Sequence, residues 1–325
     1  MQKIKWGIIG CGDVTEKKSG PAFSKIPGSE LVAVMRRDAE KAADYAQRHG
    51  VPKWYADADE LLNDPEINAI YIATPPDSHH EYTLKALRLG KPVYVEKPMA
   101  RTAAECDEMV RVSAETGTPL FVAYYRRELP YFIKVKELID SKAIGELRSV
   151  HITLHWPPYV EETGPDAKPR WRVDPTISGG GHFHDLASHQ FDFLEYALGP
   201  VSYATGISRN QAGLYAADDV VAAAFEFESG VVGTGSWCFT GAKSQRLDQT
   251  TLLGTEGKIT FSFFEKFTIH LENVDGAQTF EIPYPEHVQQ PLIETIVAEL
   301  LGKGACPSSG ETGARANHIL EWITS

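Results

Sequence analysis

Cysteine is scarce in this sequence of 325 residues: only Cys11, Cys106, Cys238 and Cys306 occur, and no two of them form a CxxC pair. A disulfide framework and a cysteine-rich zinc site are therefore not expected. Positive charge is also in short supply, because 32 Lys and Arg stand against 44 Asp and Glu, for a formal charge of −12. Nucleic acids and anionic membranes attract basic surfaces, so neither is expected as a partner. A single cationic pocket for a phosphate is still compatible with this balance.

Long apolar runs are absent as well. Stretches such as Val220–Phe225 stay far below the roughly 20 residues that span a bilayer. The first residues, MQKIKWGIIG, pass directly into charged ones, without the longer apolar stretch and cleavage site of a secretory leader. We therefore expect a cytoplasmic protein without a membrane anchor. Its length and its 42% hydrophobic residues suit two domains with real cores.

The first part of the chain alternates between short apolar strands and longer segments with helical spacing. This pattern is typical of a parallel sheet covered by helices on both faces. Gly50, Gly90 and Gly117, each with a proline two residues later, mark the helix ends. We predict a doubly wound α/β domain over residues 1–122. Its expected strands are Ile4–Ile9, Leu31–Met35, Ala69–Ala73, Pro92–Val95 and Leu120–Ala123, and its helices Ala39–His49, His79–Leu89 and Ala103–Glu115.

From about Leu147 the pattern changes to strands that alternate polar and apolar residues, joined by turns with glycine. Such strands form an antiparallel sheet with one covered face and one face left for a partner. Residues 123–325 are therefore predicted to form an α+β domain with a largely antiparallel open sheet, in contact with the first domain across a cleft. The expected strands are Ser149–His155, Val220–Glu228, Val231–Phe239, Gln249–Leu253, Lys258–Phe263 and Phe267–Leu271, and the helices Tyr131–Ser141, His184–Leu198, Gln290–Leu301 and Glu311–Trp322.

A glycine-rich turn, WGIIGCGDVT over residues 6–15, follows the first strand. Gly10 permits a tight turn, and Gly12 lets backbone N–H groups approach a pyrophosphate at the next helix, which opens with Asp13 and Val14. Thr15 stands where the fingerprint usually has its third glycine. Glycine turns are common between strands and helices, but this one opens a β/α alternation. Its position favours a Rossmann dinucleotide site.

The residues after the second strand predict the type of cofactor. An acidic residue there would bind the ribose of NAD, whereas arginine suits the extra phosphate of NADP. In this chain Arg36 and Arg37 follow the strand, and arginine binds phosphate through paired hydrogen bonds. We predict NADP as the preferred cofactor, with NAD possible. In the alternative interpretation both arginines are only solvated loop charges.

Three further motifs carry a family resemblance: IYIATPPDSH over residues 70–79, VEKP over 95–98 and GGGHFHDLASHQFD over 179–192. Together with the glycine turn, they resemble the Gfo/Idh/MocA family (glucose–fructose oxidoreductase, inositol dehydrogenase) of nicotinamide-dependent sugar oxidoreductases. The resemblance covers essentially the whole chain. Family members commonly pair their open sheets, which implies a homodimer or homotetramer through the C-terminal sheet. Relatives commonly have asparagine at the position of Asp77, so any contact made by that asparagine is in doubt.

The resemblance also implies the catalytic residues. Lys97 of the EKP triplet matches the lysine at the nicotinamide pocket, and its peptide bond to Pro98 is often cis in relatives. Asp185 and His189 match the acid and the histidine of the last motif, and a spacing of four places both on one helix face. Oxidising a secondary alcohol moves a hydride to nicotinamide and a proton to a base, and histidine titrates near neutral pH. Lys97 and His189 are predicted to handle the proton, with Asp185 as orienter; which of the two moves it stays open.

Cofactor and substrate contacts complete the predicted site. Tyr124 and Arg127 follow the last strand, where ligands bind in open α/β sheets, and Trp171 and Arg172 match a Trp-Arg pair of relatives. The predicted cofactor contacts are Gly10, Gly12, Asp13, Val14, Arg36, Arg37, Ala73, Thr74, Pro75, His79, Glu96 and Lys97. The predicted substrate contacts are Tyr124, Arg127, Trp171, Arg172, Asp185 and His189.

The predicted function is an NADP-preferring dehydrogenase or reductase that acts on a sugar, a cyclic polyol or a vicinal diol. Two alternatives are a non-catalytic NAD(P)-binding regulator, against which the catalytic residues speak, and a lyase or glycosidase with bound NAD, against which Arg36 speaks. His182 and His184 crowd near Asp185 and His189, but a metallohydrolase would want further ligands from elsewhere. No metal site is predicted.

Overall fold

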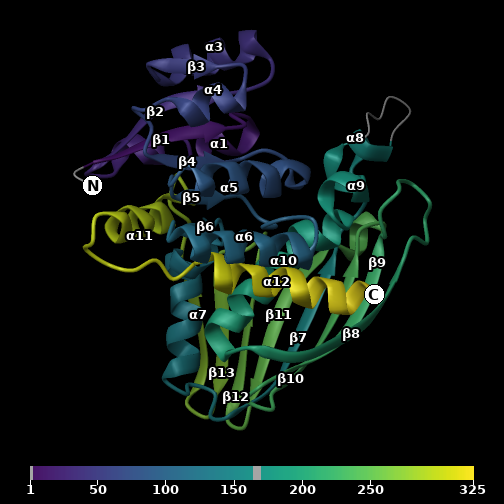
Figure 1. The fold of residues 1–325 in the computed structure, drawn as a ribbon. Coiled ribbons are helices and arrows are strands. Elements are labelled where there is room, and N and C mark those ends of the chain that lie inside the picture. The colour runs from purple at the N-terminus through teal and green to yellow at the C-terminus, as the bar shows by residue number, and fades with distance from the viewer. Residues whose placement is uncertain (1–2, 164–169) are drawn as a thin grey trace. The chain divides into compact units, whose positions relative to one another are not determined.

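The computed structural model describes residues 3–163 and 170–325, and the chain divides into two compact units. Unit 1 comprises Met1–Leu129 and Pro285–Arg315, and unit 2 comprises Pro130–Tyr284 and Ala316–Ser325. Figure 1 shows both units and the elements named below. The segment Pro285–Arg315 therefore belongs to the same unit as the first strands, although more than half of the chain separates them.

Unit 1 is built on a six-stranded parallel sheet in the order β3-β2-β1-β4-β5-β6. This is the strand order of a Rossmann fold, in which the direction of winding reverses between β1 and β4. The strands are β1 (Ile4–Ile9), β2 (Ser29–Met35), β3 (Lys53–Tyr55), β4 (Ala69–Ile72), β5 (Val93–Val95) and β6 (Leu120–Val122). The helices are α1 (Asp13–Lys17), α2 (Ala22–Lys25), α3 (Ala39–His49), α4 (Ala58–Asn63), α5 (His79–Arg88), α6 (Ala103–Thr116) and α11 (Gln290–Leu300), with short 3₁₀ turns η1 (Pro76–Ser78) and η2 (Tyr125–Glu128).

The predicted doubly wound sheet is thus confirmed, and so are the helix ends at glycine. The strands β4, β5 and β6 are buried along their whole length, which is why they read as unbroken apolar runs. Gly50 and Gly117 end α3 and α6 with φ of 65° and 61°, a left-handed conformation that glycine adopts without a steric cost. The strand β3 and the helices α2 and α4 were not predicted.

Unit 2 contains an eight-stranded sheet in the order β14-β13-β12-β11-β7-β10-β9-β8. All neighbours pair antiparallel except β7 and β10, which are parallel. The strands are β7 (Leu147–His155), β8 (Val201–Arg209), β9 (Val220–Phe227), β10 (Val232–Cys238), β11 (Leu247–Gly254), β12 (Gly257–Phe261), β13 (Thr268–Asn273) and β14 (Gly276–Glu281). The helices are α7 (Pro130–Asp140), α8 (Val160–Thr163), α9 (Pro175–Ser178), α10 (Gly181–Leu198) and the last part of α12 (Gly310–Thr324), with 3₁₀ turns η3 (Trp171–Val173) and η4 (Lys243–Gln245).

The prediction of a largely antiparallel sheet is confirmed, but β8 and β14 were missed. The helix α10 packs on one face of this sheet. Phe183 meets Trp237 edge to face with ring centroids 5.0 Å apart, Phe191 meets Phe225 at 5.2 Å, and Trp237 Nε1 donates to Gln190 Oε1 at 2.7 Å. This contact fixes α10, and with it the polar residues that the helix carries.

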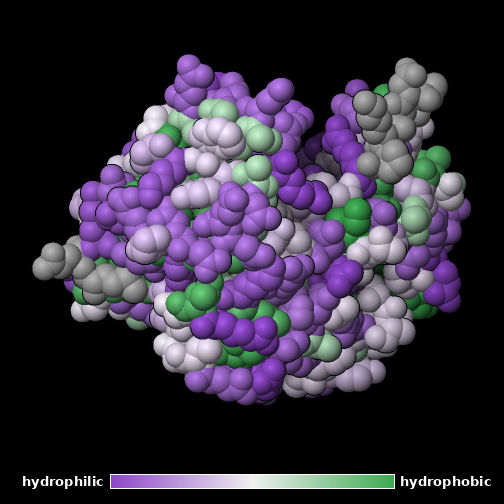
Figure 2. Space-filling view, turned by 45° about the horizontal axis from the view of Figure 1, so that its top comes forward, coloured by the Kyte–Doolittle hydropathy of each residue, from purple (hydrophilic) through white to green (hydrophobic). Residues whose placement is uncertain are grey.

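On the face drawn in Figure 2, hydrophilic residues prevail and hydrophobic ones form small, separate groups. No helix within residues 3–163 and 170–325 combines the length and the apolar character that crossing a bilayer requires.

Candidate functional site

The glycine turn after β1 behaves as the sequence predicts. Gly10 has φ +94°, and a Cβ placed there would lie 2.7 Å from Thr74 Cγ2 and 2.8 Å from Thr74 N. Only glycine therefore allows this turn to pack against the loop after β4. A Cβ on Gly12 would meet nothing closer than 3.9 Å, so the space in front of Gly12 is open. The two glycines form a cradle at the β1–β4 switch point, where a dinucleotide pyrophosphate fits.

Thr15 takes the place of the third glycine of the fingerprint and is fully buried. Its hydroxyl donates to Gly12 O at 2.8 Å, and its own carbonyl accepts from the Tyr45 hydroxyl at 2.8 Å. The side chain thus turns back onto the glycine turn and closes it. In the usual fingerprint, the third glycine allows close packing because it has no side chain. In this chain the Thr15 side chain fits because it forms a hydrogen bond with the turn.

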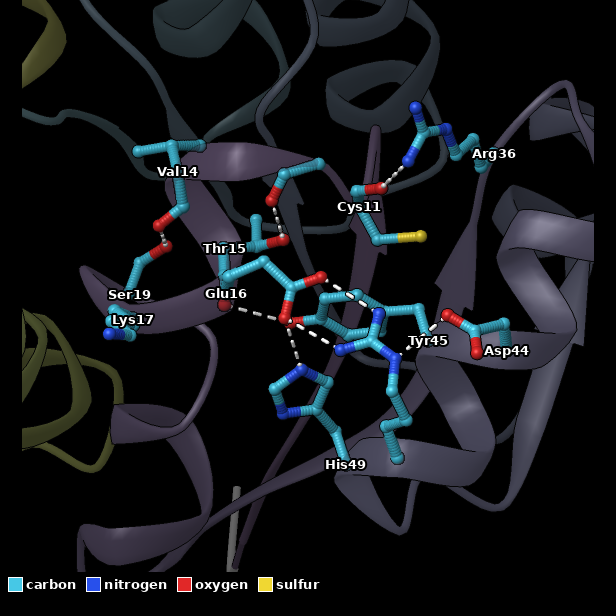
Figure 3. A network of polar contacts seen from close by, with 12 residues as sticks. Cys11, Val14, Thr15, Glu16, Lys17, Ser19, Arg36, Asp44, Tyr45 and His49 are labelled. Atoms are coloured by element: carbon cyan, nitrogen blue, oxygen red, sulfur yellow. Dashed lines mark hydrogen bonds and ion pairs between the residues drawn. The ribbon is translucent and has the colours of Figure 1, made fainter.

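Arg36 extends from the end of β2 toward the glycine turn, where its Nη1 donates to Cys11 O at 3.3 Å (Figure 3). Arg37 is exposed. The nearest carboxylate after the strand, Asp38, caps α3 by accepting from Lys41 N at 3.2 Å and also pairs with Lys41 Nζ at 2.7 Å. The carboxylate of Asp38 is therefore used to cap α3, whereas the guanidinium of Arg36 lies beside the glycine turn.

An ion network ties α1 to α3 next to this turn (Figure 3). Arg48 donates with Nη1 and Nη2 to the two carboxylate oxygens of Glu16, both at 2.9 Å, and its Nε donates to Asp44 at 2.7 Å. His49 lies 2.8 Å from Glu16 Oε2. The hydrogen bonds from Arg48 lower the pKa of Glu16 to about 2, and His49 adds to the effect. The short helix α1 is held by this network at its carboxyl-terminal end.

The loop after β4 is braced from two sides. Ser78 donates to Thr74 Oγ1 at 2.8 Å, and the ring nitrogens of His79 lie 2.8 Å from Thr74 O and 3.0 Å from Pro98 O. His79 is fully buried, and burial lowers its pKa. Its ring therefore links the loop that carries Thr74 and Pro75 to the turn that carries Lys97. A direct contact of Ala73, Pro75 or His79 with the cofactor stays a prediction.

Glu96 lies in a buried network whose members come from distant parts of the chain. Its Oε1 accepts from Tyr71 and from Gln289 Nε2, both at 2.6 Å, and Lys97 N donates to its Oε2 at 3.3 Å. Gln289 comes from the returning segment of unit 1, and its Oε1 accepts from Tyr94 at 2.8 Å. No local pattern marks Gln289, so the sequence offered no signal for it.

Lys97 is half-buried, and its peptide bond to Pro98 is cis, as the resemblance implied. Tyr124 is fully buried, and Arg127 donates with Nη1 to Pro307 O and, at 3.0 Å, to Thr312 Oγ1. These contacts connect Arg127 to the segment Pro285–Arg315 and so stabilise unit 1. Substrate contact by Tyr124 and Arg127 stays a prediction.

In unit 2, Asp185 and His189 both lie on α10, one helical turn apart and nearly buried. The structure thus places the predicted pair on one helix. Arg172 Nε donates to Asp185 Oδ2 at 3.1 Å, and its guanidinium stacks over the Trp171 ring at 4.3 Å. Trp171 therefore supports Arg172, and Arg172 in turn binds the carboxylate of Asp185.

The neighbouring histidines have other partners. His182 Nε2 lies 2.8 Å from Glu162 Oε2, and both side chains are buried. His184 packs against Gly180, where a Cβ would lie 1.9 Å from its Nδ1. Burial lowers the pKa of His184 to about 4. Both residues are helical and not extended, so they do not share a face. Within the described ranges, no three His, Cys, Asp or Glu side chains are grouped as metal ligands.

An aromatic group near α10 was missed by the sequence analysis. Trp156 and Tyr159 follow β7 with ring centroids 6.4 Å apart, and Phe264 lies 5.6 Å from Trp156 and 6.3 Å from His189. Burial raises the pKa of the Tyr159 hydroxyl, on which the charges of Arg246, Glu162, Asp185 and Arg172 also act. The sequence offered one signal for these aromatic residues, which is that Trp156 and Tyr159 lie within four residues of the end of the predicted strand Ser149–His155.

Comparison with known proteins places the chain in a family. The oxidoreductase family with NAD-binding Rossmann fold (GFO_IDH_MocA) matches residues 4–124, and the GFO/IDH/MocA C-terminal domain matches residues 132–260. Oxidoreductase P35 of Formosa agariphila is 41% identical over 321 residues, 98% of each chain. Trans-1,2-dihydrobenzene-1,2-diol dehydrogenase of Mus musculus is 30% identical over 288 residues, 87% of this chain and 80% of that protein. A solved levoglucosan dehydrogenase, in complex with NADH and levoglucosan, shares the fold with a TM-score of 0.86 at 23% identity, over 99% of this chain and 96% of that one.

The two family models and the relative of 41% identity define an oxidoreductase with an NAD-binding Rossmann fold. The chain belongs to the Gfo/Idh/MocA family, as its motifs indicated. It is an NAD(P)-dependent oxidoreductase, and its homologues are dehydrogenases and reductases that act on CH–OH groups.

Proposed function

We propose that this protein is an NADP-preferring dehydrogenase or reductase that interconverts a secondary alcohol and a ketone on a sugar, a cyclic polyol or a vicinal diol. The observation that carries the proposal is the pair Asp185 and His189 on one face of α10, with Arg172 bound to the carboxylate. An acid and an imidazole in this arrangement suit proton transfer to and from an alcohol. The names of the relatives, a diol dehydrogenase and a levoglucosan dehydrogenase, support this substrate class.

The chain's own residues divide the work. Bound nicotinamide supplies the acceptor or donor of the hydride. In the oxidative direction the alcohol also loses its O–H proton, which we assign to Lys97 and His189. Asp185 orients a substrate hydroxyl by accepting its hydrogen bond, and Arg172 holds this carboxylate in place. In the reductive direction the same groups return the proton to the carbonyl oxygen.

Residues of unit 1 would hold the dinucleotide. The backbone at Gly12, Asp13 and Val14 suits the pyrophosphate, because the space in front of Gly12 is open. Arg36 favours the additional phosphate of NADP, with Arg37 as a further cation. The engagement of Asp38 in the cap of α3 supports the same preference, since no other acid directly follows β2.

Two measurements test this function. Titration of tryptophan fluorescence with NADP and with NAD should give tighter binding of NADP, and equal affinities would remove the cofactor argument. A panel of sugars, inositols and diols, followed at 340 nm with oxidised and reduced cofactor, should then reveal turnover. If both dinucleotides fail to bind at millimolar concentration, the enzymatic function is wrong.

We also propose that the outer face of the unit 2 sheet joins two copies of the chain into a homodimer or a homotetramer. By strand register, one row across this face consists of Thr251, His151, Thr234, Ala224 and Thr205, none of them buried. Two copies that each carry a charge of −12 repel one another, and a row of uncharged side chains across the face allows their approach. Light scattering should show an oligomer that the double substitution T234E/A224E dissociates. A monomeric native protein at micromolar concentration would contradict this.

The cytoplasm is the proposed location, since a dehydrogenase of this class depends on the dinucleotide pool of the cell. Cell fractionation with an activity assay on each fraction tests this assignment.

A further inference from the structure

Arg246 stands at the start of β11, beside the end of β7. Leu247 pairs with His155 in the sheet, so Arg246 lies next to Trp156, the residue after β7. The Arg246 guanidinium stacks over the Trp156 ring with 5.1 Å to the centroid, and its Nε donates to Glu265 Oε1. The arginine is thus held between an aromatic ring and a carboxylate. About 45% of its side chain is exposed, so it can meet a ligand.

The loop that carries Glu265 is held by Asp248, the acid of β11. Asp248 is buried and accepts from the backbone N–H groups of Phe263, Phe264 and Glu265 at 3.2, 2.6 and 3.2 Å. Ser262 Oγ also donates to Asp248 and in turn accepts from Glu265 N at 3.1 Å. Four donors on one carboxylate fix the backbone of this loop. The position of Glu265, and through it that of Arg246, is therefore set before any ligand binds.

The same loop connects Arg246 to the candidate catalytic helix. Phe264 stands 5.6 Å from Trp156 and 6.3 Å from His189. The rings of Trp156, Phe264 and His189 therefore follow one another from Arg246 to α10. Tyr159 adds a hydroxyl to this row, 6.4 Å from Trp156 between ring centroids. Trp156 and His189 are buried, but Phe264 and Tyr159 are only half-buried, so their rings offer apolar surface beside polar donors. This combination suits a sugar ring.

The charges of this group are balanced pair by pair. Arg246 has Glu265, and Arg172, the other arginine stacked on a tryptophan, has Asp185 at 3.1 Å. Each arginine uses Nε for its carboxylate, and neither forms a hydrogen bond through Nη1 or Nη2 to a residue within the described ranges. The terminal nitrogens are therefore hydrogen-bond donors of an ion pair whose net charge is zero. They can bind hydroxyl oxygens, but they do not compensate the desolvation of an anion.

We propose that Arg246 is a specificity-determining residue that binds the hydroxyls of an uncharged sugar or polyol ring and that Glu265 makes this site reject acidic sugars. The inference rests on the proposed function and narrows its substrate class. A uronate or a sugar phosphate would bring its charge next to the carboxylate of Glu265. A neutral ring instead contacts the exposed parts of Phe264 and Tyr159 and accepts hydrogen bonds from the guanidinium.

The test compares matched substrates on the full-length enzyme with NADP or NADPH. Neutral sugars are paired with their charged counterparts, for example glucose with glucuronate and glucose 6-phosphate, and galactose with galacturonate. The native enzyme should favour the neutral member of each pair by about tenfold or more in kcat/KM, the effect of one unfavourable charged contact. Glu265→Gln should raise the relative use of the acidic member by about tenfold, because Arg246 then keeps an uncompensated charge.

A matched control removes the same charge elsewhere in unit 2. Glu228 is exposed in the turn between β9 and β10, at the end of the sheet opposite to Arg246 by strand register. Glu228→Gln should leave the ratio unchanged. Arg246→Lys keeps the charge but loses the planar stack, so KM for the neutral sugar should rise about fivefold or more with little change in kcat, while thermal unfolding stays close to that of the native protein.

The outcomes separate the two proposals. Equal or better use of the acidic sugars by the native enzyme would overturn the role of Arg246 and Glu265 and leave the dehydrogenase function standing. So would an acid-to-neutral ratio that responds alike to Glu265→Gln and Glu228→Gln. If NADP binds but no neutral sugar of the panel is turned over, this inference falls alone. If neither dinucleotide binds at millimolar concentration, the dehydrogenase function falls, and this inference falls with it.

Discussion

Replacing Arg36 with aspartate should reverse the cofactor preference of this enzyme. Arg36 follows β2 and points to the glycine turn, where Nη1 reaches Cys11 O at 3.3 Å. The remaining donors of its guanidinium suit a phosphate monoester on the ribose. An aspartate would instead accept hydrogen bonds from the two ribose hydroxyls of NAD and repel the phosphate of NADP. The substitution should therefore weaken one cofactor and strengthen the other.

The size of the effect follows from the exposure of the arginine. A hydrogen bond to a charged group contributes about 1.5–3 kcal/mol, and a half-buried site favours the lower part of this range for each of two bonds. Loss of the pair should cost about 3 kcal/mol, or roughly 150-fold in the Kd of NADP at 1.36 kcal/mol per tenfold. The fold should persist, because a bond of 3.3 Å to Cys11 O is near the long limit for a hydrogen bond and contributes little.

Fluorescence titration of the native and variant proteins with both cofactors, at one fixed salt concentration, measures this change. Arg88→Gln serves as the control, since Arg88 is exposed at the end of α5, just before β5 begins and away from the carboxyl ends of the strands. The control should bind NADP as the native protein does. If Arg36→Asp binds NADP within about threefold of the native Kd, Arg36 does not contact the phosphate, and the reasoning is refuted.

Three further predictions concern catalysis and acid stability. Lys97→Ala and His189→Ala should each lower kcat by roughly 10²–10⁴-fold while NADP still binds; a folded variant with full turnover would contradict the assignment. Glu16 has a pKa of about 2 in the fold against 4.5 ordinarily, so its stabilisation, about 0.5–1 kcal/mol at this exposed site, is present above pH 4.5 and is lost toward pH 2. The free energy of unfolding, measured with urea at pH 5 and at pH 3, should differ less between the two pH values for Glu16→Gln than for the native protein. His184 has a pKa of about 4 in the fold against 6.5 ordinarily, so the free energy of unfolding should fall by up to about 3 kcal/mol as the pH falls from 6.5 to 4. In His184→Asn the urea midpoint should depend less on pH over this range. An unchanged dependence would refute the role of His184.

The parts of the fold that the sequence predicted are those in which local pattern and burial agree. The strand β4 is buried on both faces and reads as a continuous apolar run, and Gly50 and Gly117 end helices where their φ is positive. The motif residues Asp185 and His189 fall on one helix as their spacing required. In each case the determining interaction spans fewer than about five residues, so it leaves a trace in the sequence itself.

The missed parts either lack a buried side-chain pattern or depend on partners that lie farther along the chain. The strand β14 has no buried residue, and β3 has none either; their hydrogen bonds to a neighbouring strand make them strands, whereas their side chains show no buried pattern. The parallel pairing of β7 with β10 likewise follows from the route of the chain. Among site residues, Gln289 reaches Glu96 and Arg246 reaches Glu265 only after the sheets have formed. Such contacts have no local signature.

The return of Pro285–Arg315 to unit 1 has a consequence for the order of events in the cell. The ribosome has to translate past Gln289 before Glu96 and Tyr94 can acquire that partner. The nascent Rossmann sheet therefore holds a carboxylate in its interior without this partner until residue 289 has been translated. A fragment that stops at Leu129 should emerge as a chaperone client and aggregate on release, and co-expression of Pro285–Arg315 as a separate peptide should help to restore its solubility.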